Sequence, residues 1–209
     1  MCGTPDLIAS PGQGSLLLIS LCIIAGVYPA LFLDRDGVII ENCPDYIRSW
    51  EDVRFYPHAL EALASIRNSP YKIVIVTNQS AIGRGLISLE TALQINQQII
   101  ETIERHGGRI HGSFMCPHTP LDDCDCRKPR PGLFHQAAKA LTLDLGQSYL
   151  IGDALSDLLA GQTAGLRQTV LVRTGRGTEQ DSLARPKELN AFLTFETLSD
   201  ALAALFQND

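Results

Sequence analysis

The chain has 209 residues, of which 45% are hydrophobic and 19% are charged. This balance is that of an ordinary globular protein and excludes a largely disordered one, and the length suits one domain. Seventeen basic side chains against twenty-three acidic ones give a net charge of −6. A nucleic-acid-binding protein needs a basic face, so nucleic acid is not an expected partner, whereas a small anionic substrate is compatible with this charge.

Residues 15–33 form an uncharged, mostly apolar run at the threshold length of a membrane span. No Lys or Arg precedes the run and no clear small-residue cleavage site follows it, which is unlike a signal peptide. Its end, residues 30–33, also suits a buried strand. We therefore expect residues 1–28 to be an extension outside the fold. Such an extension would result if the true start of the protein lies near Val27 and the assigned start precedes it. A packed extra segment and a membrane or export signal are the alternatives.

Residues 29–209 are expected to form one domain, because strand-like apolar runs alternate with helical periodicity along them. Strands are predicted at 31–33, 72–76, 110–115, 149–151 and 169–172, and helices at 57–68, 88–105, 132–143, 155–164 and 198–206. Pro57 suits the first turn of the first helix, and Ser88 suits the cap of the second. The alternation predicts an α/β fold, a Rossmann-like parallel sheet with helices on both faces. Ligands of such sheets bind at the carboxyl ends of the strands.

Two carboxylates, Asp34 and Asp36, directly follow the first predicted strand. One carboxylate can attack as a nucleophile while the other gives and takes a proton. The alternative is a solvated acidic turn. Asp153 follows the strand at 149–151 and is a plausible Mg²⁺ ligand opposite Asp34. Asp157 can orient Lys128 or cap the following helix.

Polar and basic residues at two further strand ends can bind an anion. The segment 77–80 offers short donors for phosphate oxygens, although it can equally be a helix cap; its residues are Thr77, Asn78, Gln79 and Ser80. Arg127 can grip an anionic substrate with its forked guanidinium, and Lys128 can act as a point charge on a phosphoryl group. The alternative for this pair is a solvated basic loop.

Three cysteines and a histidine crowd into residues 116–126: Cys116, His118, Cys124 and Cys126. Three thiolates and one imidazole make a suitable tetrahedral set for Zn²⁺, and a closed set of four protein ligands is structural rather than catalytic. Such clustering favours metal binding in a reducing compartment. The alternative is a group of buried reduced cysteines near an unrelated histidine.

The order of these motifs along the chain is similar to that of a known family. Asp-x-Asp-Gly, Thr-Asn, Lys-Pro and Gly-Asp-x-x-x-Asp occur in that order over residues 30–175, and the arrangement resembles the haloacid dehalogenase superfamily of phosphohydrolases. Segments 33–38, 76–80 and 126–132 are similar to its branch of heptose 1,7-bisphosphate phosphatases and histidinol phosphatases. The resemblance implies a minimal cap domain and a zinc loop, and no long insertion interrupts the chain.

The resemblance also implies roles for matching residues. Asp34 attacks the phosphoryl group, giving an aspartyl-phosphate, and Asp36 protonates the leaving oxygen and then activates water. Mg²⁺ is held by Asp34, the backbone carbonyl of Asp36, and Asp153. Thr77 and Lys128 stabilise the transferred phosphoryl group. Substrate binding falls to Asn78, Gln79, Ser80 and Arg127, with the loop 42–46.

The implied substrate is a small phosphorylated sugar, a heptose 1,7-bisphosphate that loses its 7-phosphate. Histidinol phosphate is the alternative substrate, and a non-catalytic phospho-accepting module is the alternative outside the enzymes. Asp36 argues against such a module, because a group that only accepts phosphate has no need of a general acid. We expect a monomer in the cytoplasm with no membrane partner.

Overall fold

The computed structural model describes residues 26–206. Their centre is a six-stranded sheet in the order β3-β2-β1-β4-β5-β6, in which every neighbouring pair is parallel. The strands are β1 (Tyr28–Leu33), β2 (Lys72–Asn78), β3 (Gly112–Cys116), β4 (Leu143–Gly152), β5 (Gln168–Val172) and β6 (Leu193–Phe195). The predicted α/β class is therefore confirmed.

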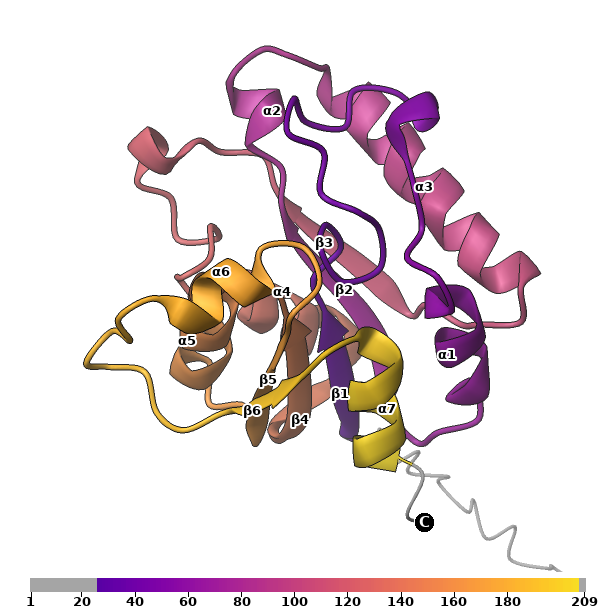
Figure 1. Ribbon diagram of the computed structural model, residues 1–209, viewed down its shortest axis with the longest axis vertical. Helices are drawn as coiled ribbons and strands as arrows, with labels where there is room; N and C mark the ends of the chain where they lie inside the picture. The colour runs from indigo at the N-terminus through magenta and orange to yellow at the C-terminus, as the bar shows by residue number, and fades with distance from the viewer. Residues whose placement is uncertain (1–25, 207–209) are drawn as a thin grey trace, which may run out of the picture.

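Helices cover both faces of this sheet (Figure 1). The α-helices are α1 (Ala59–Ser65), α2 (Ser80–Gly83), α3 (Leu89–Arg105), α4 (Gly132–Leu141), α5 (Leu155–Thr163), α6 (Gly177–Ser182) and α7 (Leu198–Phe206), and two 3-10 helices span Trp50–Asp52 and Pro120–Asp122. One apolar layer joins α1, α3 and α7 to the sheet, and a second joins α4 and α5 to its opposite face. The segment between β1 and α1 holds only one of the short 3-10 helices and two isolated bridges, as a minimal cap requires.

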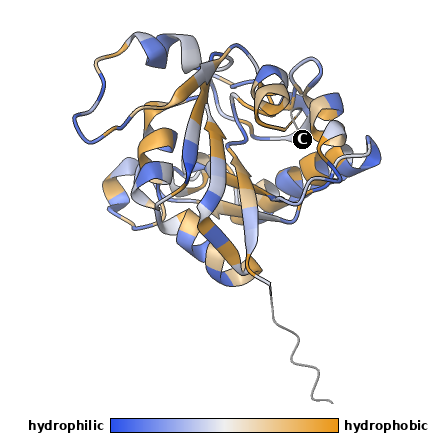
Figure 2. Cartoon of the chain, turned by 90° about the horizontal axis from the view of Figure 1, so that it is seen from below, coloured by the Kyte–Doolittle hydropathy of each residue, from blue (hydrophilic) through white to orange (hydrophobic). Residues whose placement is uncertain are grey.

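Strand β1 lies in the middle of the sheet and is apolar on both sides. Its residues Ala30–Leu33 are fully buried, because helices cover both faces of a parallel sheet. Figure 2 shows the same distribution, with mostly hydrophobic strands in the centre and hydrophilic loops at the periphery. Leu33 pairs with Ile75 of β2 and with Ile151 of β4. Three neighbouring strands therefore end nearly level, and the residues that follow them meet at one edge.

Most predicted elements occur within a few residues of their expected bounds, and the differences have local causes. The helix predicted at 132–143 ends at Leu141, because Thr142 adopts the left-handed conformation with φ 55°. Leu143 then starts β4, which is longer than the strand predicted at 149–151. Pro57 precedes the first helix instead of lying in its first turn, since α1 starts at Ala59. Ser88 caps α3 as predicted, accepting a hydrogen bond from the Thr91 amide at 3.0 Å.

The expected N-terminal extension lies almost entirely outside the described residues, which start at Gly26. Strand β1 starts at Tyr28, close to the proposed boundary. Across residues 26–206, no helix has both the length and the apolar character needed to cross a membrane.

Candidate active site

Lys128 joins two carboxylates at the carboxyl edge of the sheet. Its ammonium group lies 2.7 Å from Asp34 Oδ1 and 2.8 Å from Asp157 Oδ1, and it also donates to the Val76 carbonyl at 2.9 Å. All three charged side chains are buried. Asp157 also accepts the Ala154 amide at the start of α5, at 3.1 Å. Asp157 therefore has both of the roles considered for it, orienting Lys128 and capping the helix.

Burial dominates the ionisation of these groups. It raises the pKa of Asp34 to about 8, against the opposing effect of Lys128 and with the help of the neighbouring carboxylates. Burial alone would lower the pKa of Lys128, but the carboxylates of Asp157 and Asp34 outweigh it and hold that pKa above its usual value. Lys128 is therefore a permanent cation in a cluster with an excess of carboxylates.

Asp153 completes the acidic cluster from the end of β4. Oxygen atoms of Asp34, Asp153 and Asp157 all lie within 4.8 Å of one another. Asn42 Nδ2 and the Arg176 backbone amide each donate to Asp153 Oδ2 at 2.9 Å, and the Arg176 guanidinium lies 3.3 Å from Oδ1. Burial raises the pKa of Asp153 above its usual value, with a further contribution from Asp157.

The Asp36 carboxylate accepts hydrogen bonds from a different set of donors. Arg35 Nε lies 3.0 Å from Asp36 Oδ2, and Gln79 Nε2 donates to the same oxygen at 2.7 Å. The Thr77 hydroxyl lies 3.4 Å from that oxygen and accepts from Gln79 at 2.9 Å. Asp36 is thus oriented by its neighbours while its side chain remains 23% exposed. Arg35, fully buried, was not singled out from the sequence.

Two glycines allow the chain to pass close to this cluster. Gly37 has φ +90°, and a Cβ there would lie 2.0 Å from Asp153 Oδ2. Gly175 has φ +58°, and a Cβ there would lie 2.4 Å from the same oxygen. Only glycine fits both the left-handed conformation and the space at these positions.

The cluster opens into a cavity of about 650 Å³. Its lining includes eight candidate residues: Asp34, Asp36, Thr77, Asn78, Gln79, Ser80, Arg127 and Lys128. Asn78 exchanges two hydrogen bonds with the Lys128 backbone, at 3.1 and 3.2 Å, and so ties β2 to the loop that carries Lys128. Arg127 donates to the His118 carbonyl at 3.1 Å.

Arg176 also lines this cavity, although the sequence reasoning missed it. The signal was present, because Arg176 comes shortly after the strand at 168–172, and residues beyond strand ends are where the other candidates were found. Arg84 lines the cavity as well.

The predicted zinc ligands lie together beside the cavity. Cys116 Sγ is 3.6 Å from Cys124 Sγ and 3.2 Å from Cys126 Sγ, and His118 Nδ1 is 3.3 Å from Cys126 Sγ. Four ligands about 2.3 Å from one zinc ion would lie roughly 3.8 Å apart, so this cluster is nearly the size of a tetrahedral site. Burial raises the pKa of the Cys116 thiol to about 12, so this thiol needs a cation beside it to ionise.

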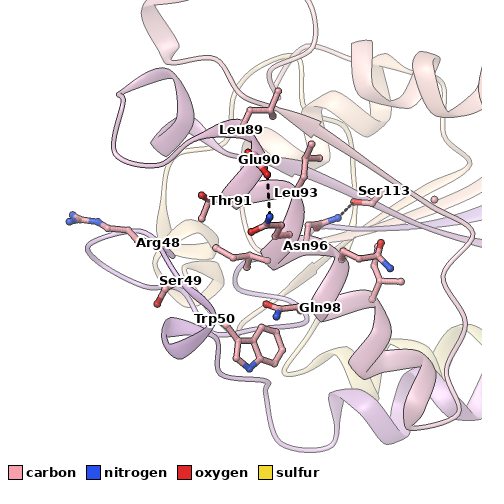
Figure 3. Close-up of a pocket in the computed structure, with 15 residues that line it drawn as sticks. Arg48, Ser49, Trp50, Leu89, Glu90, Thr91, Leu93, Asn96, Gln98 and Ser113 are labelled. Carbon is pink, nitrogen blue, oxygen red and sulfur yellow. Dashed lines mark hydrogen bonds between the residues drawn. The ribbon is translucent and has the colours of Figure 1, made fainter.

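A larger hollow of about 1260 Å³ lies along α3 and is shown in Figure 3. It is lined by α3, the loop around Trp50 and the start of β3. Asn96 is buried in its wall and donates to the Ser113 hydroxyl at 3.0 Å. None of the candidate residues lines this hollow, so the smaller acidic cavity is the better active site.

Comparison with known proteins agrees with this geometry. The profile of the HAD-hydrolase-like family matches residues 125–201. The D-glycero-beta-D-manno-heptose-1,7-bisphosphate 7-phosphatase of Haemophilus ducreyi is 41% identical over 155 residues, which are 70% of this chain and 84% of that relative. This chain belongs to the HAD-like phosphatase family.

Further members of the HAD-like phosphatase family match more of the chain. The Pseudomonas aeruginosa protein of the same name is 35% identical over 177 residues, covering 85% of this chain and 97% of that relative. A crystal structure of D,D-heptose 1,7-bisphosphate phosphatase from B. bronchiseptica, complexed with magnesium and phosphate, has a TM-score of 0.79 at 32% identity. The match covers 87% of this chain and 99% of the B. bronchiseptica chain. The family resemblance noted in the motifs is thereby confirmed.

Proposed function

We propose that this chain is a Mg²⁺-dependent phosphomonoesterase that removes the 7-phosphate of D-glycero-β-D-manno-heptose 1,7-bisphosphate through an aspartyl-phosphate. The observation that carries the proposal is the buried contact between Asp34 and Lys128, which places a carboxylate and a fixed cation at the floor of one cavity. The names of the HAD-like relatives supply the substrate and its β anomer.

Asp34 is the proposed nucleophile. Lys128 engages its Oδ1, and within residues 26–206 no hydrogen-bond donor contacts Oδ2. That free oxygen can attack phosphorus while the bond from phosphorus to the sugar oxygen breaks. An attacking group held in a fixed position avoids the entropy cost of a bimolecular encounter.

Asp36 is the proposed general acid and base. It gives a proton to the departing sugar oxygen, and then takes one from the water that attacks phosphorus and releases Asp34. Arg35 and Gln79 hold the carboxylate in position, and its exposed fraction gives it access to the cavity. Gln79, expected to bind substrate, is therefore assigned a positioning role as well.

Thr77 and Lys128 are the proposed stabilisers of the transferred phosphoryl group. Fixed donors and cations in a buried site stabilise developing charge more than water does. Asn78 holds the Lys128 backbone in place, and Arg127 and Ser80 face the same cavity for contacts to the rest of the substrate.

The acidic cluster also suits Mg²⁺. Asp34, Asp153 and Asp157 are all buried and close together, and Lys128 contacts two of them. A buried excess of carboxylates favours a hard cation with oxygen ligands. Asp34, Asp153 and the Asp36 carbonyl would hold it, and the ion would lower the repulsion between carboxylate and phosphate.

Zinc is proposed at Cys116, His118, Cys124 and Cys126 as a structural ion. Gln79 N donates to the Cys116 carbonyl at 2.8 Å, and Gly83 N donates to the Pro117 carbonyl at 2.9 Å. The zinc loop thus packs against the end of β2 and carries Arg127 and Lys128 into the cavity. A monomer in the cytoplasm remains a prediction.

Phosphate release with Mg²⁺ tests the proposal, using both anomers of heptose 1,7-bisphosphate and histidinol phosphate. Asp34→Asn protein is the blank. Preference for the β heptose bisphosphate supports the proposal, and preference for histidinol phosphate would keep the mechanism and change the substrate. Folded, metal-loaded protein that releases phosphate from none of them would contradict the proposal and favour a non-catalytic module.

A further inference from the structure

Three arginines line the active-site cavity in addition to Lys128. The charge of Lys128 is matched by two carboxylates at 2.7 and 2.8 Å. Among residues 26–206, Arg127 donates to a neutral carbonyl and neither Arg127 nor Arg84 forms an ion pair. Arg176 pairs with Asp153 at 3.3 Å. The cavity therefore carries more guanidinium charge than its own carboxylates neutralise.

Arg176 differs from the other two because its backbone is tied to the reacting centre. Its amide donates to Asp153 Oδ2 at 2.9 Å. The Thr174 hydroxyl donates to the Gly37 carbonyl at 2.6 Å, and the Gly175 amide donates to the Tyr56 hydroxyl at 2.8 Å. The loop 174–176 is thus fixed on the turn that follows β1 and on the end of β4.

The side chain of Arg176 is held less tightly than its backbone. It is 55% exposed, whereas the Asp153 side chain that it touches is 0% exposed. Its guanidinium reaches Asp153 only at 3.3 Å, which is long for a charge-assisted hydrogen bond. The loop therefore holds the base of the side chain and leaves the cation available to the cavity.

We propose that Arg176 binds the second phosphate of a bisphosphate substrate, the one that is not transferred; this rests on the proposed function. The transferred group is met by Lys128 and Thr77 on the β2 side of the cavity, while Arg176 enters from the opposite side, beyond β5. A monophosphate offers Arg176 no anion. Arg176 is thus a specificity-determining residue that separates bisphosphates from monophosphates.

The test compares Arg176→Gln with the wild type on heptose 1,7-bisphosphate and on heptose 7-phosphate. Loss of one charge-assisted contact should raise KM for the bisphosphate by about tenfold or more, with little change in kcat. KM for the monophosphate should stay within about twofold, and Arg176→Lys should restore part of the loss because it keeps the charge. Arg173→Gln is the matched control, since Arg173 lies on the same loop but pairs with Asp181 and Glu196.

Two binding measurements separate the inference from its alternatives. Calorimetry on Asp34→Asn protein, with and without Arg176→Gln, compares the bisphosphate with the monophosphate without turnover. Calorimetry with Mg²⁺ alone tests whether Arg176 instead positions Asp153. The inference predicts that Arg176→Gln removes the preference for the bisphosphate and does not weaken Mg²⁺ binding.

Three results for Arg176→Gln would overturn the inference. They are an equal loss of affinity for the bisphosphate and the monophosphate, no loss of affinity for either sugar, or weaker Mg²⁺ binding. Failure of the proposed function looks different. In that case wild-type protein binds the bisphosphate with an Arg176-dependent preference but releases no phosphate from it. Absence of any preference in binding would count against Arg176 whether or not turnover occurs.

Discussion

The ammonium group of Lys128 lies 2.7 Å from the carboxylate of Asp34, although 94 positions separate the two residues. The contact forms because Asp34 directly follows the central strand β1 and the loop that carries the Cys/His cluster returns the chain to that point. Both side chains are buried, so neither charge is shielded by water. The pair fixes Oδ1 of Asp34, and among residues 26–206 no hydrogen-bond donor contacts the other carboxylate oxygen.

Replacing Lys128 tests the importance of this contact. Lys128→Met leaves Asp34 and Asp157 without their shared cation, and we expect the free energy of unfolding to fall by about 3 kcal/mol. The rate of phosphate release should fall by about 100-fold or more. Urea unfolding and steady-state assays measure the two effects. Lys139→Met is the control, because Lys139 is exposed on α4, and a Lys128→Met protein as stable and active as this control would contradict the assignment.

Asp36→Asn separates the two chemical steps. A sugar is a poor leaving group and needs the proton of Asp36, whereas para-nitrophenolate does not. We expect phosphate release from the sugar ester to fall by about 100-fold or more, as loss of general acid–base catalysis implies. Formation of the phosphoenzyme from para-nitrophenyl phosphate should fall much less, visible as a burst of para-nitrophenol. Equal losses of the first step for both esters would argue against a general acid at this position.

Zinc content and stability should change together. A closed four-ligand site predicts about one zinc per chain by metal analysis. Cys124→Ser should release the zinc and lower the melting temperature, while Cys43→Ser, outside the cluster, should do neither. A Cys124→Ser protein that keeps its zinc and melts like the wild type would show that the loop needs no metal.

Mg²⁺ binding should depend on pH. In the metal-free protein burial raises the pKa of Asp34 to about 8, so this carboxyl must lose a proton to bind the ion at lower pH. The apparent affinity for Mg²⁺ should therefore rise between pH 6 and pH 8, by calorimetry. Asp34→Asn should flatten this dependence. Equal wild-type affinities at pH 6 and pH 8 would contradict the assignment.

The sequence predicted the parts of the site that depend on local signals. Asp34 and Asp153 follow buried apolar strands, so the strand-end rule located both of them. The predicted zinc ligands lie within eleven residues, and their spacing alone indicated a metal site. The short strand β6, with three residues, offered no periodicity and was missed.

Other parts of the site depend on contacts between distant segments. Arg176 comes shortly after β5, as the strand-end rule requires, but its contact with Asp153 depends on β5 lying beside β4. The contact between Gln79 and Asp36 depends on how the side chains turn where β1 and β2 end. Strand-end rules give the edge of the sheet at which a site forms, but not the partners of each side chain.

The most direct test of the account is chemical trapping of phosphorylated Asp34. Asp36→Asn protein is mixed with substrate and Mg²⁺, quenched in acid and reduced with borohydride, which converts an aspartyl-phosphate to homoserine. Peptide mass spectrometry then locates the converted residue. The account predicts homoserine at position 34 and an unmodified Asp153. Substrate consumption with no conversion at position 34, or with conversion at another carboxylate, would contradict it.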